Sequence, residues 1–253
     1  MSGRRRLGHI SWGRVGSMSH SVRTDGASAG SEASLRDLVY KALMSAISEM
    51  GIYDHPGEPQ LHEHELSHIL GVSRTPVREA LAILEHQGFV RCKPRRGVFV
   101  IKKNKLEIVE MVYACAGLES MAVRLACAKA TEAQLGALRA SFGAFYEADR
   151  SSGYDRYFEA RWRFCRHAAT LAQCQEIQSM LDHLLLHLRS VHEVIFRGNV
   201  DLSYLRSAYV AIIAAIEERD AERACQLVLE RGFRFARDIE GCADFPQSLT
   251  KID

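Results

Sequence analysis

Apolar residues recur at steps of three and four along most of this chain, a spacing that places them on one face of an α-helix. The first such stretch runs from Leu35 to Ile47, and Gly51 ends it. Residues 54–59 then hold two prolines and a glycine, which is typical of a turn because proline fixes φ and glycine permits a sharp reversal. The pattern predicts one helix followed by a tight connection.

Two further helices are predicted close together. The first runs from about His62 to Leu70, Gly71 supplies a tight turn, and the second opens at Ser73, a natural N-cap residue. The apolar residues of the second helix fall on one stripe, formed by Val77, Ala80, Leu81 and Leu84. Its opposite side carries Thr75, Arg78, Glu79 and Ala82, flanked by Arg74. One face of this helix is therefore expected to pack, and the other to be presented.

After Gly88 the period shortens to the alternation of β-strands. Residues 89–93 and 98–101 alternate around Pro94, Arg95, Arg96 and Gly97, which predicts a β-hairpin. No acidic residue lies between Glu85 and Glu107. The basic residues in the same interval are Arg91, Lys93, Arg95, Arg96, Lys102, Lys103 and Lys105. The hairpin thus concentrates the charge that a nucleic-acid backbone attracts.

The rest of the chain returns to helical spacing, with breaks near 130–131, 151–153, 198–199 and 220. Because nothing there alternates with a period of two, we expect an antiparallel bundle of about six helices and a mainly α fold. Both ends lack periodicity and are expected to be tails. The predicted organisation is a disordered tail at 1–33, a first domain at 34–103, a helical domain at 104–241 and a C-terminal tail at 242–253.

Composition narrows the class of protein. The chain has 253 residues, enough for two domains, and a net charge of +2 that conceals the local basic cluster. Its seven cysteines include no CxxC pair, which predicts reduced thiols and argues against a disulfide framework or a zinc ribbon. No apolar run approaches the ~18 residues of a membrane helix, and no secretory signal precedes the first domain. We expect a soluble, cytoplasmic protein.

The short turn between two helices, followed by a hairpin, predicts a winged helix-turn-helix. In that motif the second helix enters the major groove of DNA, where Arg reads guanine edges and Ser or Thr holds phosphates. The run GVSRTPVREAL at 71–81 strengthens this prediction. With Pro56-Gly57, Glu65-Leu66, Leu84-Glu85 and Gly88-Phe89-Val90, it resembles the GntR family of bacterial transcription regulators, over most of residues 35–102.

The resemblance implies roles for individual residues. Arg74 and Arg78 would contact bases or adjacent phosphates, and Gly97 would let the hairpin approach the minor groove. His64 occupies a place where relatives often carry a basic phosphate contact, so its contribution would depend on pH. The predicted DNA contacts are His64, Ser73, Arg74, Thr75, Pro76, Arg78, Arg95, Arg96 and Gly97. The alternative for these side chains is a solvated surface.

The helical domain resembles the FCD effector domain of the FadR-type branch of that family, through Leu118-Glu119, Leu125-Ala126 and the Asp220-x3-Ala224 step. Many relatives hold a divalent metal there with an Asp and three His. At the matching positions this chain has Arg161, Cys165, Tyr209 and Arg231, and Cys115 replaces a common pocket Arg. Because guanidinium groups repel a cation, we expect no metal and no other cofactor.

Helical spacing places Arg161 and Arg231 within apolar stripes, so both charges are expected to point inwards. A buried Arg needs an acceptor, and a carboxylate supplies both charge and geometry. Two interpretations stay open: the carboxylate belongs to an anionic effector, or each Arg pairs with an internal Asp or Glu or extends to solvent. The candidate effector-binding residues are Cys115, Arg161, Cys165, Tyr209 and Arg231, of which Tyr209 also suits a core position.

A second candidate site involves three histidines. His183 and His187 are four residues apart, a spacing that can hold a metal, but both lie off the leucine stripe of their helix and are expected at the surface. His192 falls nearer the apolar side, where a hydrogen-bonded core histidine is the default. A metal-responsive regulator that uses these residues is one alternative.

The combined prediction is a sequence-specific, DNA-binding transcription regulator. Two chains would pair through their helical domains over a palindromic operator, and a small carboxylate-bearing effector would relieve repression. The chain shows no nucleophile elbow, Gly-rich phosphate loop or metal-ligand cluster, so we expect no enzymatic activity, although an enzyme fused to a DNA-binding module is an alternative. Another is a DNA-binding dimer whose helical domain binds no ligand.

Overall fold

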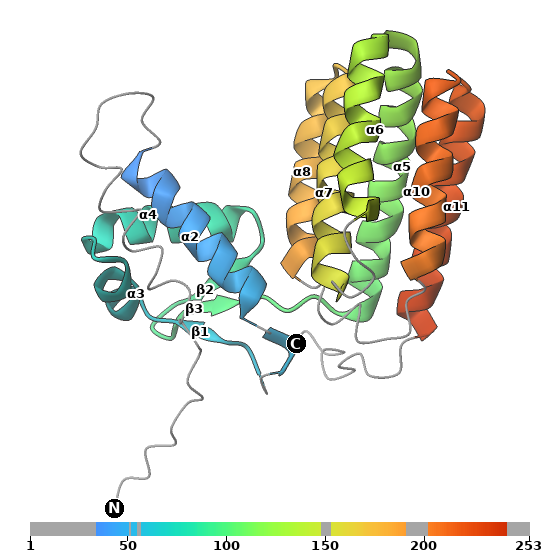
Figure 1. The fold of residues 1–253 in the computed structure, drawn as a ribbon. Coiled ribbons are helices and arrows are strands. Elements are labelled where there is room, and N and C mark those ends of the chain that lie inside the picture. Colours follow the sequence, from blue (N-terminus) through green and yellow to red (C-terminus); the bar gives the residue numbers. More distant parts are fainter. Residues whose placement is uncertain (1–33, 51, 55–56, 148–152, 191–201, 242–253) are drawn as a thin grey trace, which may run out of the picture. The chain divides into compact units, whose positions relative to one another are not determined.

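The computed structural model describes residues 34–50, 52–54, 57–147, 153–190 and 202–241. The two predicted tails lie outside these residues. The chain divides between Lys102 and Lys103 into two compact units, each of which is described by itself (Figure 1). Within the described residues, no helix is both long and apolar enough to cross a bilayer.

In its described residues, the N-terminal unit has three helices, a short 3₁₀ turn and a small sheet. Its elements are α2 (Leu35–Glu49), η2 (Ile52–Asp54), β1 (Gln60–Leu61), α3 (Glu63–Leu70), α4 (Arg74–His86), β2 (Val90–Lys93) and β3 (Gly97–Val100). A capping box opens α2, in which the Ser34 side chain accepts from the Asp37 N–H and the Asp37 carboxylate accepts from the Ser34 N–H. The order is that of a winged helix-turn-helix.

Helix α4 packs its apolar stripe inwards, as its periodicity predicts. Its buried residues are Pro76, Val77, Ala80, Leu81 and Leu84, and α2 lies against it. The turn between α3 and α4 depends on Gly71, which adopts the left-handed conformation (φ 67°) that ends α3 and lets the chain reverse. The predicted helix, short turn and helix are therefore confirmed.

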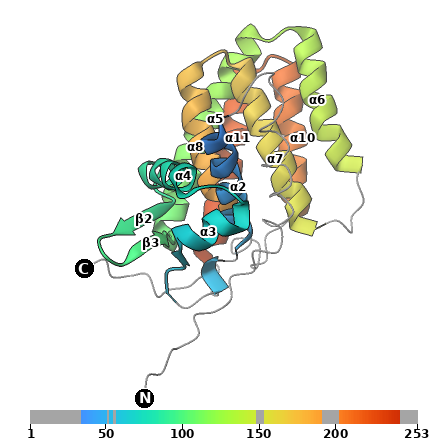
Figure 2. The ribbon, with the colours of Figure 1, turned by 90° about the vertical axis from the view of Figure 1, so that its left-hand side faces the viewer.

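The sheet has three antiparallel strands in the order β1-β3-β2. The predicted hairpin is confirmed, with Val90 opposite Val100 and Lys93 opposite Gly97, and Figure 2 shows it beside α4. Strand β1 was not predicted. It pairs Gln60 with Phe99, and two residues are too few to produce a periodicity that sequence alone could reveal.

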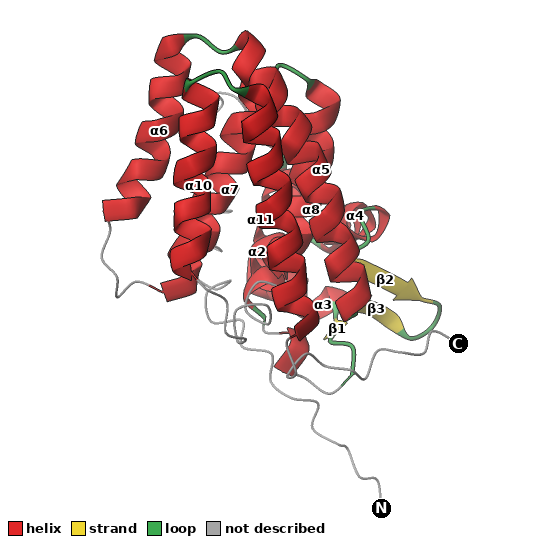
Figure 3. Cartoon of the chain, turned by 90° about the vertical axis from the view of Figure 1, so that its right-hand side faces the viewer, coloured by secondary structure: helices red, strands yellow, loops and turns green. Residues whose placement is uncertain are grey.

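Among its described residues, the C-terminal unit consists of helices joined by short loops and contains no strand (Figure 3). Its helices are α5 (Lys105–Lys129), α6 (Glu132–Glu147), α7 (Gly153–Leu171), α8 (Gln175–Ser190), α10 (Leu202–Glu217) and α11 (Ala221–Gly241). They form an antiparallel bundle in which α5 contacts α7, α8, α10 and α11. The predicted breaks at 130–131 and 220 separate α5 from α6 and α10 from α11, whereas the break between α7 and α8 was not predicted.

Helices α5 and α11 pack closely because a glycine lies between them. Gly232 of α11 is buried, and a Cβ added there would overlap the Ala116 methyl group of α5. Glycine in a helix interior costs roughly 0.5–1 kcal/mol relative to alanine, so this position is kept small by packing. The close approach brings the polar residues of both helices to the centre of the bundle.

Gly232→Ala is expected to lower the free energy of unfolding by about 1–3 kcal/mol, because the added methyl group overpacks the contact with Ala116. Gly136→Ala is the matched control: a Cβ at Gly136 of α6 meets nothing within 4 Å, so the same change should raise stability by roughly 0.4–1 kcal/mol. Denaturant unfolding of both variants measures the difference. A gain in stability in both variants would show that the contact between α5 and α11 can accommodate a methyl group at position 232.

Candidate functional site

Helix α4 presents the side chains that the sequence assigned to its outer face. Arg74, Thr75, Arg78 and Glu79 are exposed. Ser73 occupies the N-cap position as predicted, but its side chain makes no capping hydrogen bond. An N-cap oxygen normally accepts from the N–H of the second or third helical residue. The third residue here is Pro76, which has no N–H, so only the N–H of Thr75 could serve as donor.

Pro76 corrects one prediction. Its side chain is buried in the first turn of α4 and belongs to the packed face, so we withdraw it from the set of DNA contacts. Proline suits this position because its fixed φ matches a helical first turn, where backbone N–H groups lack intrahelical partners. Its role is to start α4 rather than to touch a ligand.

Arg78 is held by a neighbour that the sequence did not reveal. Its Nε donates to Glu63 Oε2 of α3 at 2.6 Å, while 63% of the Arg78 side chain stays exposed. An exposed pair of this kind contributes little stability, about 0–1 kcal/mol, but it restricts the direction of the guanidinium. His64, a predicted phosphate contact that follows Glu63 in the chain, is also exposed.

The tip of the hairpin presents two arginines on a strained turn. Arg95 has a positive φ of 61°, and the Arg96 N–H donates to the Lys93 carbonyl at 2.9 Å. Gly97 has φ 104° and lies against Gln60, whose Nε2 donates to the Arg96 carbonyl at 2.6 Å. A Cβ at Gly97 would come within 2.7 Å of that nitrogen. The turn therefore requires Gly97, independently of any approach to DNA.

Part of the basic cluster is neutralised within the unit. Glu58 pairs with Arg91 and, at 2.6 Å, with Lys93. Burial by itself would raise the pKa of Glu58, but the two cations outweigh this effect and hold the pKa below its usual value. The free charge of the hairpin is thus concentrated at Arg95 and Arg96, whose side chains have no ion pair among the described residues.

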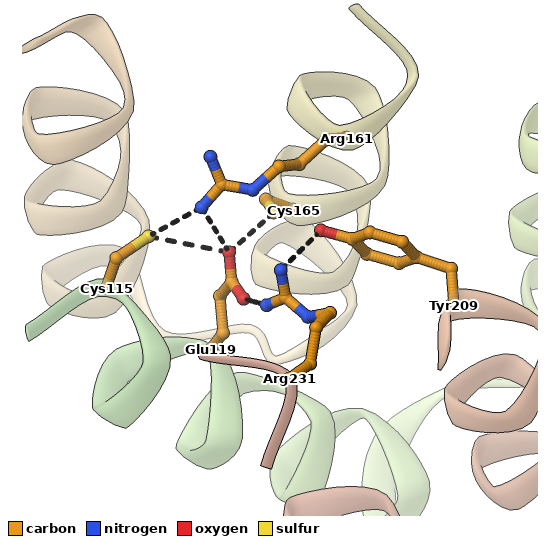
Figure 4. Close-up of polar contacts among 6 residues, drawn as sticks. All are labelled: Cys115, Glu119, Arg161, Cys165, Tyr209 and Arg231. Atoms are coloured by element: carbon orange, nitrogen blue, oxygen red, sulfur yellow. Dashed lines mark hydrogen bonds and ion pairs between the residues drawn. The ribbon is translucent and has the colours of Figure 1, made fainter. Parts of the chain in front are cut away.

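In the C-terminal unit, the five predicted effector-binding residues meet around a sixth, Glu119 (Figure 4). They come from four helices: Cys115 and Glu119 from α5, Arg161 and Cys165 from α7, Tyr209 from α10 and Arg231 from α11. The charged side chains of Glu119, Arg161 and Arg231 are each about 4% exposed or less. In the sequence, Glu119 is distinguished only as part of the resemblance to the FCD domain.

The two guanidiniums are held unequally by Glu119. Arg231 Nη2 pairs closely with Glu119 Oε2, and Arg231 Nη1 donates to the Tyr209 hydroxyl at 2.8 Å. Arg161 Nη2 lies 3.8 Å from Glu119 Oε1. The Nε atoms of both arginines have no hydrogen-bond partner. An internal carboxylate therefore satisfies Arg231 much better than Arg161.

Glu119 is also the acceptor for two thiols. Cys165 Sγ donates to Glu119 Oε1 at 2.7 Å and Cys115 Sγ donates to the same oxygen at 3.4 Å. Burial raises the pKa of both thiols, and the negative charge of Glu119 raises them further, so both stay protonated. Burial alone would raise the pKa of Glu119, but Arg231 and Arg161 hold it below the usual value.

These residues do not fit a divalent cation. Glu119 is the carboxylate of the cluster, and its oxygens already accept from Arg231 and two neutral thiols. Two guanidiniums beside the same point would repel a metal ion. Among the described residues, no group of three His, Cys, Asp or Glu side chains is arranged to hold a metal.

The histidine pair of α8 differs from its prediction. His183 is exposed as expected, but His187 is only 6% exposed, so its assignment to the surface was wrong. Helix α8 packs against both α5 and α7, which buries a wider face than the leucine stripe indicated. The two rings lie 4.8 Å apart, and His192 falls outside the described residues.

The fold and the exposed face of α4 define the protein as a winged helix-turn-helix regulator with a helical effector domain. Comparison with protein-family models supports this class of protein. Residues 35–100 match the model "Bacterial regulatory proteins, gntR family", and residues 110–231 match the FCD domain. The chain belongs to the GntR family and is a DNA-binding transcription regulator with a ligand-binding effector domain.

Individual relatives support this assignment. The HTH-type transcriptional repressor RspR of Escherichia coli (strain K12) is 27% identical over 167 residues, which cover 66% of this chain and 73% of RspR. The Nta operon transcriptional regulator of Aminobacter aminovorans is 40% identical over 84 residues, which cover 33% of this chain and 40% of the relative.

Solved structures support the fold. E. coli McbR/YncC is similar with a TM-score of 0.69 at 21% identity, over 83% of this chain and 98% of its own. A putative GntR regulator from Rhodococcus sp. RHA1 has a TM-score of 0.66 at 22% identity, over 82% and 98%. The predicted fold class, a winged helix-turn-helix joined to an FCD-like bundle, is confirmed.

Glu119→Gln is expected to lower the free energy of unfolding by about 3–5 kcal/mol at neutral pH, because it leaves two buried guanidiniums without a counterion. A lowered carboxyl pKa stabilises the fold above the unfolded value near 4.5 and loses that contribution as pH falls through the folded pKa. The difference in free energy of unfolding between Glu119→Gln and the parent should therefore shrink as the pH falls below about 4.5 and through the folded pKa of Glu119.

Denaturant unfolding at several pH values measures this gap. Glu222→Gln is the control, because Glu222 is an exposed partner of Arg124 and its loss should change stability little at any pH. A gap for Glu119→Gln that persists unchanged into acid would contradict an ionised Glu119.

Proposed function

We propose that this protein represses transcription as a homodimer on a palindromic operator and releases the operator when a small carboxylate-bearing effector binds within its helical bundle. The observation that carries the DNA-binding half of this proposal is the exposed N-terminal part of α4. The packed stripe of that helix is buried in its own unit, which leaves Arg74, Thr75 and Arg78 exposed together. In a helix-turn-helix these N-terminal positions contact base edges and phosphates.

The hairpin supplies the second contact surface. Arg95 and Arg96 lie at its tip on a turn held by Gln60, and they suit phosphates or the minor groove. Ser73 keeps a hydroxyl that does not cap its own helix and is available for a phosphate. His64 would add an exposed, pH-dependent contact from α3.

A palindromic operator requires two copies of the chain, because each copy carries one helix-turn-helix. Exposed apolar side chains on α5 and α11 support pairing of the helical domains. These residues are Leu106, Tyr113, Met121 and Phe233, and the rings of Tyr113 and Phe233 lie 5.6 Å apart. We place this activity in the cytoplasm, with the DNA.

The effector half of the proposal rests on Arg161. Its guanidinium is buried, its nearest carboxylate oxygen is 3.8 Å away, and its Nε has no partner. A buried charge in this condition favours an added acceptor, which a carboxylate supplies. We propose that the site works without a metal or other cofactor, since the guanidiniums already provide positive charge.

A second candidate function has an observation in its favour. Glu119 pairs with Arg231, which agrees with the interpretation that a buried Arg pairs with an internal acid. The cluster would then serve only to hold the bundle together. The protein would then be a DNA-binding dimer that takes no ligand. A thermal-shift screen against small carboxylates separates the two, because a ligand that binds the folded state must raise the melting temperature.

Arg78→Ala is expected to weaken operator binding by about 1–3 kcal/mol, or roughly 5- to 150-fold in Kd, because it removes a charge that faces the groove. An operator selected from random duplexes with the parent protein, followed by fluorescence anisotropy, provides the measurement. Arg124→Ala removes an exposed arginine of the other unit and should leave the Kd unchanged. Equal affinities for Arg78→Ala and the parent would rule out the proposed orientation of α4.

Arg161→Ala is expected to abolish operator release by any carboxylate found in the thermal-shift screen, while the unliganded variant still binds the operator. The reason is that the change removes the poorly satisfied guanidinium and leaves α4 untouched. Release of the operator is measured by fluorescence anisotropy as the concentration of the carboxylate is raised at constant pH. Loss of the folded state in circular dichroism would instead give Arg161 a structural role.

A further inference from the structure

Among the described residues, the buried cluster has one more positive charge than negative charge. Arg161 and Arg231 contribute two positive charges and Glu119 one negative charge. The remaining members, Cys115, Cys165 and Tyr209, are neutral in their ordinary states, and burial keeps both thiols protonated. Because an uncompensated charge is costly away from water, the count favours one additional negative charge.

Both η nitrogens of Arg231 are occupied, although its Nε, like that of Arg161, has no hydrogen-bond partner. Its Nη2 is held by Glu119 Oε2, its Nη1 donates to the Tyr209 hydroxyl at 2.8 Å, and its guanidinium carbon lies 4.7 Å from the centre of the Tyr209 ring. An incoming carboxylate that binds these η nitrogens would have to displace Glu119, which has no alternative cation of equal proximity.

Arg161 is the open member of the pair. Its Nη2 reaches Glu119 Oε1 and Cys115 Sγ only at 3.8 Å each, distances longer than a strong charge-assisted hydrogen bond. Its Nε has no partner, as in Arg231, so the two buried arginines differ in their η nitrogens, which have close oxygen partners only in Arg231. Phe235, whose ring centre lies 5.6 Å from the guanidinium carbon, offers no acceptor oxygen.

The two thiols compete with Arg161 for one oxygen of Glu119. Both donate to Oε1, the oxygen that faces Arg161, with Cys165 at 2.7 Å and Cys115 at 3.4 Å. Their protons use the lone pairs that a close ion pair with Arg161 would need. The cysteines thus help to leave Arg161 without a close acceptor.

We propose that the effector is a monoanion, an organic acid with a single carboxylate that Arg161 holds, and that Glu119 is a built-in counterion which excludes acids with a second carboxylate. This inference rests on the proposed function, since it presupposes that an effector binds in the bundle. A monoanion makes the cluster neutral. A dianion leaves a net buried negative charge with no second guanidinium to receive it.

The test uses the full chain and pairs of straight-chain acids that differ in a second carboxylate: butyrate against succinate, and hexanoate against adipate. Each acid is titrated at neutral pH and constant ionic strength while the melting temperature and the Kd for the selected operator are followed. We expect each monocarboxylate to act at a concentration at least about tenfold lower than its paired dicarboxylate. A dicarboxylate that acts at an equal or lower concentration overturns the monoanion proposal and leaves an anionic effector in place.

Absence of any effect from all the acids would overturn the monoanion proposal together with the effector half of the proposed function. Operator binding, measured in the same titrations, would still report separately on the DNA-binding half. The two failures are therefore distinguishable.

Arg161→Gln provides the matched variant test. It should raise the effective concentration of the monocarboxylates at least about tenfold, whereas Arg124→Gln, at an exposed ion pair, should leave it unchanged. If Arg161→Gln does not fold, the comparison of acid pairs on the parent protein still decides. Retention of the full response in a folded Arg161→Gln variant would overturn the proposal.

A spectroscopic measurement checks the charge count without any ligand. If Tyr209 were ionised beside Arg231, the cluster would be neutral by itself and would have no need of an anion. We expect no tyrosinate absorbance in the ultraviolet spectrum of the folded protein at neutral pH. A tyrosinate band that disappears in Tyr209→Phe would overturn the proposal.

Discussion

The pairing of Glu119 with two buried guanidiniums is the interaction on which the helical domain depends. It joins α5, α7 and α11 at one point, and each partner would be costly to bury alone. Such a cluster restricts how these helices can slide, since any shift that separates Arg231 from Glu119 exposes an unpaired charge to an apolar interior. A ligand that binds Arg161 would therefore act on the same three helices that hold the bundle together.

The DNA-binding unit follows the same principle with weaker, exposed pairs. Glu63 restrains Arg78 and Glu58 neutralises Arg91 and Lys93, which leaves positive charge where the chain can present it: at the start of α4 and at the hairpin tip. Exposed pairs contribute little stability, so they direct side chains without resisting their exchange for a phosphate. The two units thus use ion pairs for different purposes, cohesion in one and orientation in the other.

Sequence analysis succeeded where a local pattern specifies the outcome. The buried stripe and exposed face of α4 follow from its 3.6-residue period, and the hairpin follows from alternation around Pro94 to Gly97. It failed where the outcome depends on a distant neighbour. Strand β1 exists because β3 lies beside it, Pro76 is buried by the packing of α4, and His187 is buried because α5 and α7 flank α8.

The sequence by itself determined the helical periodicity, the turn chemistry and the family motif, because these are written in neighbouring residues and need no knowledge of distant contacts. It also indicated that Arg161 and Arg231 point inwards, but left open whether an effector or an internal acid receives them. Only the tertiary structure decided that Glu119, which is far from both arginines in the chain, pairs closely with Arg231 and lies 3.8 Å from Arg161. Charge balance in a core is a property of side chains from different helices, and the packing of those helices settles which of them meet.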